Sequence, residues 1–240
     1  MTIKNLYTQN GGQLQCITMG AGGGKPRQYK IYPNVIMVMR HTERLDEFFP
    51  DWISKNVNHP YKPYDLNMPM ALPVQRPPQA YQGDPPITNT GDILARLIAR
   101  GMYSTAYVPD LIYCSPSLRC IQTAYAVKQV TKCKAPIRVE PGLFESFNNY
   151  PMGLPEFATP QQRAQFNVDE NYTPHTKLED IVGHAQTVDI AAGTFAKKQR
   201  HSTEVDLCWD QVKIPYGALL VLERIEAAQK LRIFIRHLNV

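Results

Sequence analysis

Histidine and arginine side chains stand just after short apolar runs at several points of this 240-residue chain. Arg40 and His41 follow the first run. Arg119 lies just beyond the second, and His184 follows the third. Guanidinium groups bind phosphoryl oxygens as planar forks, and the N–H groups at a helix start add partial positive charge. These residue types therefore indicate a binding site for a phosphate group.

The apolar runs have the features of strands in an α/β protein. Residues 34–40 read NVIMVMR, which is typical of a strand buried on both faces of a parallel sheet. Strands that alternate with helices predict an α/β sandwich. The predicted strands are residues 34–40, 111–115, 137–139 and 181–183, with a closing pair at 216–222 and 231–235; the predicted helices are 90–101, with Thr90 as N-cap and Gly101 at the end, 117–130 and 187–196. Because ligands bind beyond the carboxyl ends of strands in such sheets, three strand ends should meet at one edge.

Four segments resemble the histidine phosphatase (phosphoglycerate mutase-like) superfamily. Residues 40–44 read RHTER, similar to its R-H-G-x-R signature, and residues 115–124 read SPSLRCIQTA, similar to S-P-x-x-R-x-x-Q-T-A. Residues 139–145 read VEPGLFE, and residues 183–185 read GHA, similar to the segment of the family's second histidine. The resemblance covers residues 34–235 and is greatest to the TULA/Sts group of tyrosine phosphatases and ecdysteroid-phosphate phosphatases. It implies a three-layer α/β/α sandwich with a mainly parallel central sheet.

The resemblance also implies roles for the first histidine and the arginines. His41 would attack phosphorus and form a phosphohistidine, since a neutral imidazole nitrogen is a competent nucleophile near pH 7. Arg40, Arg44 and Arg119 would hold the phosphoryl oxygens. No metal and no cofactor is implied, because the arginines supply the positive charge.

Two residues farther along the chain complete the implied mechanism. Glu145 would protonate the leaving oxygen and then activate the water that cleaves the phosphohistidine. Glu140 lies nearby in the sequence and is a rival for this role. His184 would stabilise charge on the transferring group.

Details of the motifs favour phosphate-ester hydrolysis over phosphoglycerate-type mutase chemistry. Arg44 fits the phosphatase pattern, whereas mutases of this fold carry a small polar residue there. Ala185 after His184 differs from the His-Asp pair of secreted acid phosphatases, so the acid must come from elsewhere, and Glu145 fits. The expected substrate is a phosphotyrosine protein or a small phosphate ester.

The sequence departs from the family pattern at two places. Thr42 replaces the usual glycine, and its hydroxyl would either contact the phosphate or crowd it. Between Tyr172 and Ile181 a helix and most of a central strand are missing. A catalytically weak, phosphate-binding or scaffold relative therefore remains the alternative. The expected organisation is a poorly structured leader at 1–33 and a histidine phosphatase domain at 34–240.

The segment at residues 56–89 is rich in Pro, Asn and Tyr and predicts a long ordered loop beside the leaving-group side of the site. Tyr61, Tyr64 and Tyr81 would either stack on an aromatic substrate or pack within this loop.

Composition narrows the partners and the compartment. The formal net charge of +5 is spread along the chain, so we expect no nucleic-acid binding. The longest apolar runs are too short to span a bilayer, and the N-terminus lacks the apolar block of a signal peptide. We therefore expect a cytoplasmic protein without a membrane partner, with five reduced, mostly buried cysteines. The sequence is compatible with a homodimer.

Overall fold

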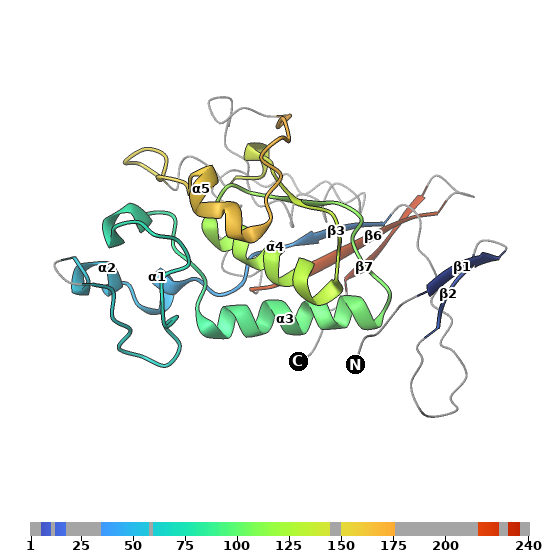
Figure 1. Cartoon of the computed structure of the whole chain (residues 1–240), viewed down its shortest axis with the longest axis horizontal. Coiled ribbons are helices and arrows are strands. Elements are labelled where there is room, and N and C mark those ends of the chain that lie inside the picture. Colours follow the sequence, from blue (N-terminus) through green and yellow to red (C-terminus); the bar gives the residue numbers. More distant parts are fainter. Residues whose placement is uncertain are drawn as a thin grey trace.

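The chain has an α/β fold, and a computed structural model describes residues 6–10, 13–17, 35–57, 60–144, 150–175, 216–225 and 230–235. Two long helices, α3 (Asn89–Ser104) and α4 (Leu118–Thr131), lie side by side, and the strands of a three-stranded sheet run behind them (Figure 1). The predicted helix at 117–130 is therefore confirmed to within a residue at each end.

The three-stranded sheet has the order β3-β6-β7. Strand β3 (Val35–Met39) pairs with β6 (Leu219–Ile225), and β6 pairs with β7 (Lys230–Ile235); both pairings are antiparallel. The predicted closing pair is confirmed. Among the described strands, the neighbour of β3 is antiparallel, whereas the sequence predicted a parallel sheet around it. The predicted burial of β3 on both faces is wrong. Side chains on the two faces of β3 differ in burial. Met37 and Met39 pack on the helices, whereas Ile36 is 54% exposed.

Parallel pairing occurs between the next two strands. Strand β4 (Ile112–Cys114) pairs with β5 (Ile137–Val139), with α4 as the connection between them. A parallel pair needs such a crossover, so the prediction of alternating strands and helices is confirmed for this unit. The strand predicted at 181–183 and the helix predicted at 187–196 lie outside the described residues.

Helix α3 begins earlier and ends later than its sequence pattern predicted. Thr88 is the N-cap, because its Oγ1 accepts a hydrogen bond from the backbone N–H of Gly91 at 2.9 Å. Thr90 lies within the first turn, so its prediction as the cap is wrong. Gly101 does not end the helix, which runs to Ser104.

Two apolar clusters hold these elements together. One lies among α3, α4 and β3 and contains Ile98, Ala99, Met102 and Val127. The other, larger cluster joins α4, β4 and β5 to the loop at 60–88 through Trp52 and other buried side chains. The shorter helices of this part are α1 (Leu45–Phe48), α2 (Trp52–Lys55), η1 (Pro78–Tyr81), η2 (Pro141–Leu143), α5 (Pro160–Arg163) and η4 (Ala164–Phe166).

The segment expected as a poorly structured leader contains an antiparallel hairpin. Strands β1 (Leu6–Asn10) and β2 (Gln13–Ile17) pair from Leu6 opposite Ile17 to Asn10 opposite Gln13. The hairpin lies at one end of the molecule in Figure 1.

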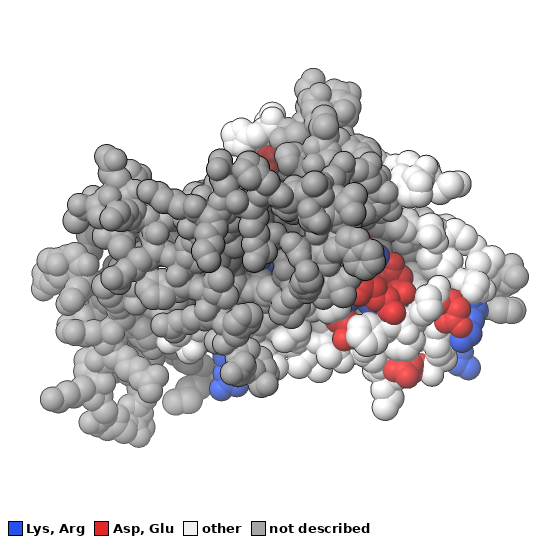
Figure 2. All heavy atoms as spheres, turned by 180° about the vertical axis from the view of Figure 1, so that it is seen from behind, with Lys and Arg blue, Asp and Glu red and all other residues white. Residues whose placement is uncertain are grey.

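In Figure 2 the few described Lys and Arg side chains that are visible lie apart from one another, and those at one end lie beside acidic side chains. Lys55 pairs with Asp51 at 2.6 Å, and Arg96 pairs with Asp92 at 2.7 Å. Cys114 and Cys133 are buried free thiols, as predicted. None of the helices in the described ranges is both long and apolar enough to cross a membrane.

Candidate active site

His41 lies two residues beyond the end of β3 and is partly buried. Its Nδ1 is 2.8 Å from the backbone carbonyl oxygen of Thr42. Because a carbonyl oxygen can only accept, the geometry assigns the proton of the neutral ring to Nδ1. The free lone pair of the neutral ring therefore lies on Nε2.

The chain just before β6 flanks His41. The backbone N–H of Gly217 donates to the carbonyl oxygen of His41 at 3.2 Å, and that of Arg40 donates to the carbonyl oxygen of Ala218 at 2.9 Å. The Tyr216 ring lies 5.7 Å from the His41 ring between centroids, and the Arg40 guanidinium lies 4.6 Å from the centre of the same tyrosine ring. Tyr216 thus contacts both members of the Arg-His pair.

Arg119 lies in the first turn of α4 and is 2% exposed. Its position brings a buried positive charge to the helix end at which the backbone N–H groups are also partly positive. The pKa of His41 is well below its usual value because burial disfavours the charged ring and because Arg119, then Arg40 and Arg44, repel the additional proton. The hydrogen bond to the Thr42 carbonyl acts in the opposite direction.

Thr42 links the turn at residues 40–44 to α4. The hydroxyl of Thr123 donates to the backbone carbonyl of Arg119 at 2.8 Å and accepts from the backbone N–H of Thr42 at 3.2 Å. The single proton of the Thr123 hydroxyl is used in its bond to Arg119. The Thr42 hydroxyl must therefore be the donor in the 3.3 Å contact between the two hydroxyl groups. Thr42 is fully buried, and its side chain faces Thr123. Of the two roles considered for Thr42, neither contact with phosphate nor crowding fits this arrangement.

Arg44 is held by an acidic neighbour. Its Nε and Nη2 donate to the two carboxylate oxygens of Asp46 at 3.0 and 2.7 Å, and Nη1 lies 3.7 Å from Glu47. The Arg44 side chain is 22% exposed. One edge of its guanidinium group is therefore occupied by Asp46 in this structure.

Glu43 connects the same turn to α3. Its carboxylate accepts from the Thr88 hydroxyl at 2.6 Å and from the Asn67 amide at 2.7 Å, and its backbone carbonyl accepts from the Thr88 N–H at 3.0 Å. Gly91 permits this approach, because a Cβ there would lie 2.8 Å from the Glu43 carbonyl oxygen. Glu43 is thus a structural residue of the site.

Glu140 is committed to structural contacts and is a poor rival for the acid/base role. One carboxylate oxygen accepts from the Tyr172 hydroxyl and from the His175 backbone N–H, both at 2.8 Å. The other accepts from the Gly142 N–H at 3.3 Å, and the residue is buried. Glu140 therefore anchors the segment at 172–175.

The tyrosines of the long loop pack within it or against its neighbours. The Tyr81 hydroxyl donates to the carbonyl of Val74 at 2.6 Å, and the Tyr61 hydroxyl donates to that of Pro69 at 2.7 Å. Tyr64 donates to Asp51 at 2.8 Å. Of the two roles considered for these residues, packing fits the contacts.

The structure thus brings together four of the six residues that the sequence singled out, namely His41, Arg40, Arg44 and Arg119. Glu145 and His184 lie outside the described residues. Sequence reasoning missed the flanking role of Tyr216 and Gly217. Gly217 has a φ of +69°, and the Tyr-Gly pair before an apolar run was the available signal. Within the described ranges, no group of three or more His, Cys, Asp and Glu side chains is arranged to hold a metal ion.

A known protein family matches the part of the chain that contains Arg119. The histidine phosphatase superfamily (branch 1) matches residues 73–202, which is more than half of the chain. The chain belongs to this superfamily. The matched region contains Arg119 and begins after His41.

Two relatives are similar to large parts of the chain. Ecdysteroid-phosphate phosphatase of Drosophila melanogaster is 32% identical over 235 residues, which cover 82% of this chain and 31% of that protein. Ubiquitin-associated and SH3 domain-containing protein B of Mus musculus is 40% identical over 158 residues, which cover 61% of this chain and 24% of that protein. The chain spans less than a third of the length of these relatives.

A solved structure agrees with the fold. The ecdysone phosphate phosphatase of the silk moth Bombyx mori, solved in complex with tungstate, superposes with a TM-score of 0.67 at 26% identity. The superposition covers 84% of this chain and 92% of that one. The predicted fold family and the resemblance to the ecdysteroid-phosphate phosphatase and TULA/Sts group are therefore confirmed.

Proposed function

We propose that the chain is a metal-independent phosphomonoester hydrolase that acts through a phosphohistidine on His41. The observation that carries this proposal is the state of His41, a neutral ring with its proton on Nδ1 and arginine charges around it. A neutral Nε2 is a nucleophile, whereas a protonated ring is not. The arginines that keep the proton away also attract the phosphoryl oxygens.

In the first step, Nε2 of His41 would attack phosphorus while the ester P–O bond breaks. The new P–N bond forms as the leaving oxygen takes a proton from Glu145. Arg40, Arg44 and Arg119 would balance the charge on the phosphoryl oxygens during transfer. Arg119 is the best placed of the three for this task, because its buried charge has the largest effect on His41 among them.

In the second step, water would attack phosphorus, the P–N bond would break, and His41 would regain its lone pair. Glu145 would take the proton of the attacking water, which returns the acid to its starting state. The assignment of Glu145 and His184 rests on the family pattern in the sequence. The commitment of Glu140 to Tyr172 and His175 supports Glu145 over its rival.

The substrate class we propose is a phosphate monoester, either a phosphotyrosine protein or a small phosphate ester. The name of the Drosophila relative, an ecdysteroid-phosphate phosphatase, supports a small phosphorylated molecule as one of these choices. The geometry of the described residues supports recognition of the phosphate group that both kinds of substrate share.

The test is hydrolysis of an aryl phosphate by the purified chain in EDTA, without added metal. His41→Ala should lower kcat by about three or more orders of magnitude, since removal of a covalent nucleophile has costs of this size in other enzymes. His175→Ala is the control, because this histidine side chain is exposed and the substitution keeps the backbone N–H that donates to Glu140; it should turn over at the rate of the wild type.

A second readout follows the intermediate itself. Rapid quenching with labelled substrate should trap one phosphate per chain, stable in base and lost in acid, in the wild type and not in His41→Ala. A folded wild type that is as inactive as His41→Ala would defeat the hydrolase proposal, and phosphate binding without turnover would then become the leading function.

A further inference from the structure

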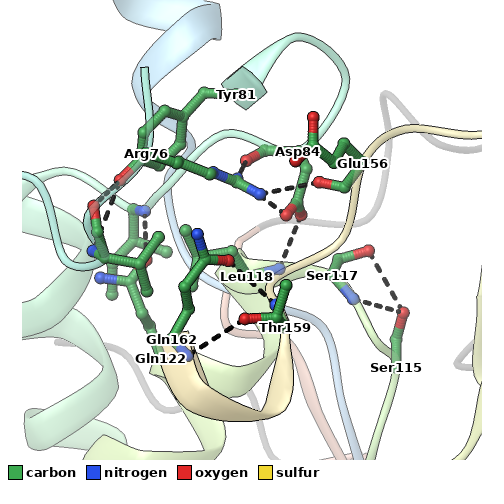
Figure 3. A network of polar contacts seen from close by, with 12 residues as sticks. Arg76, Tyr81, Asp84, Ser115, Ser117, Leu118, Gln122, Glu156, Thr159 and Gln162 are labelled. Atoms are coloured by element: carbon green, nitrogen blue, oxygen red, sulfur yellow. Dashed lines mark hydrogen bonds and ion pairs between the residues drawn. The ribbon is translucent and has the colours of Figure 1, made fainter. Parts of the chain in front are cut away.

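Asp84 holds the start of the helix that carries Arg119. Its Oδ1 accepts from the backbone N–H of Leu118 at 2.7 Å, and Leu118 is the first residue of α4 (Figure 3). The hydroxyl of Ser117, the residue in the usual capping position, lies instead 3.3 Å from that of Ser115. A carboxylate far from α4 in the sequence therefore satisfies an N–H group that the helix leaves open.

Arg76 fixes the other side of this carboxylate. Its Nη2 lies 2.9 Å from both Oδ2 and the backbone carbonyl of Asp84, and its Nη1 donates to the carbonyl of Glu156 at 2.7 Å. The guanidinium lies 4.0 Å from the centre of the Tyr81 ring, and both charged side chains are buried. Arg76 also neutralises Asp84, which prevents a net negative charge from standing beside a phosphate site.

A second connection leads from the same turn to the side chain of Arg119. Gly83 has a φ of +76°, and a Cβ there would lie 3.1 Å from Pro155 and 3.3 Å from the Tyr150 ring. The Tyr150 hydroxyl accepts from Nη2 of Arg119 at 3.3 Å. The turn thus contacts the backbone beside Arg119 through Asp84 and its guanidinium through Tyr150.

We propose that the turn formed by Gly83 and Asp84 is a positioning element for Arg119, with Asp84 as the residue that sets its place at the phosphate site. The inference rests on the proposed function for the identity of the bound group. The hydrogen bond to Leu118 fixes where the first turn of α4 begins, and a shift of that turn moves the Arg119 guanidinium with it. Positioning errors of this kind reduce affinity and rate without removing any group that touches the substrate.

The test is a double-mutant cycle on the binding of inorganic phosphate to the full chain, measured by calorimetry. Asp84→Ala should weaken binding by about tenfold, within the range of coupling between residues in one network. Asp84→Asn, whose amide oxygen can still accept from Leu118, should restore binding to within about threefold. In an Arg119→Met background, Asp84→Ala should have no further effect, because the group that it positions is already gone.

Thr131→Val is the matched control for stability, since Thr131 is buried at the other end of the same helix and its hydroxyl donates to the carbonyl of Val127. It should lower the denaturation midpoint and leave phosphate affinity unchanged. Asp84→Ala leaves the Arg76 charge buried without its partner and could prevent folding. The double variant Arg76→Met/Asp84→Leu, which replaces the ion pair by an apolar pair, then takes the place of Asp84→Ala in the cycle.

The outcomes separate the two proposals. The positioning role would be overturned if Asp84→Ala bound phosphate as tightly as the wild type. It would also be overturned if Asp84→Ala weakened phosphate binding equally in the wild-type and Arg119→Met backgrounds. Neither result would affect the proposed hydrolysis. Phosphate binding without hydrolysis by the wild type would overturn the proposed function, and the cycle would still decide the role of Asp84. A wild type that neither binds nor hydrolyses would overturn both.

Discussion

Arg119 and Arg44 carry the same charge to the same histidine from two differently built regions. Arg119 is 2% exposed and lies at the start of α4, which a buried ion pair holds in place. The Arg44 side chain is 22% exposed, and Asp46 occupies one edge of it. Arg119 has the largest effect of any charge on the pKa of His41, and Arg44 has a smaller one than Arg40.

The two arginines differ in their effect on the pKa of His41 because they differ in exposure to water and in pairing with carboxylates. A buried charge acts through a medium of low effective dielectric constant, whereas a partly exposed one is screened by solvent and salt. A carboxylate partner cancels much of the remaining field of Arg44. Burial and partners of a guanidinium therefore determine its contribution at this site more than its presence in a motif does.

Arg119→Met should have the largest effect of the variants that compare the two regions. We expect kcat/KM for an aryl phosphate to fall by about 10²- to 10³-fold, the usual loss when one preorganised donor to transition-state charge is removed. Arg138→Met, a partly exposed arginine on β5 that pairs with Asp169, serves as the control and should stay near the wild-type rate. A loss below about tenfold for Arg119→Met would contradict the ranking of the two arginines.

Gly91→Ala tests how the turn at residues 40–44 is held. The added Cβ would lie 2.8 Å from the Glu43 carbonyl oxygen and 3.2 Å from Ile87, so the turn must move away from α3. Overpacking of this kind costs about 1–3 kcal/mol, which urea denaturation can measure. Thr90→Ala, one residue earlier and exposed, should change the free energy of unfolding by less than about 0.5 kcal/mol.

Arg44→Met should have a smaller effect than Arg119→Met, and this effect should depend on salt. We expect kcat/KM to fall by about tenfold at low ionic strength, in line with a partly exposed ionic contact. In about 0.5 M salt the loss should shrink for Arg44→Met and persist for Arg119→Met, because only the exposed charge is screened. Equal salt dependence of the two variants would contradict the conclusion that solvent screens Arg44 more than Arg119.

The lowered pKa of His41 predicts how stability depends on pH. Below about pH 6.5 the unfolded chain binds a proton on this histidine that the folded protein does not, so the free energy of unfolding decreases as the pH falls toward the lowered pKa. Urea denaturation between pH 7 and pH 5 should therefore show a smaller loss of stability for His41→Asn than for the wild type. A steeper loss in His41→Asn would contradict this sign.

Thr42→Gly should have the smallest effect on catalysis. The Thr42 side chain is buried against Thr123, so restoring the glycine typical of the family removes no group from the phosphate. We expect kcat/KM within about threefold of the wild type, a range typical for changes away from the reacting atoms. A gain of more than tenfold would show that threonine crowds the site.

The sequence predicted the parts of the site that lie in short contiguous motifs. Residues 40–44 and 115–124 gave His41 and Arg119, and the period of the apolar residues placed α4. The partners that hold these motifs come from far along the chain, as Asp84 does for Leu118. Local patterns contain no information on such contacts, because they depend on which loop the fold brings to the helix start.

Cap residues show the same limit on a smaller scale. Thr88 and Thr90 both stand before the apolar pattern of α3, and either hydroxyl suits a helix start. The choice of Thr88 depends on Glu43, whose carboxylate accepts from the Thr88 hydroxyl. The antiparallel neighbour of β3 was equally hidden, since the sequence of one strand does not specify the direction of the next.

The contact of Gly217 with His41 has a consequence for how the protein is made. A growing chain that has emerged only through α4 already contains His41 and all three arginines, but it lacks the backbone bonds from Gly217 and Ala218. Strand β6 pairs with β3 only after a very long loop has closed, from Val35 opposite Glu223 to Met39 opposite Leu219, and such distant pairings form slowly. In a nascent chain the turn that follows β3 therefore lacks these two backbone hydrogen bonds until Gly217 and Ala218 have emerged and β6 has paired with β3.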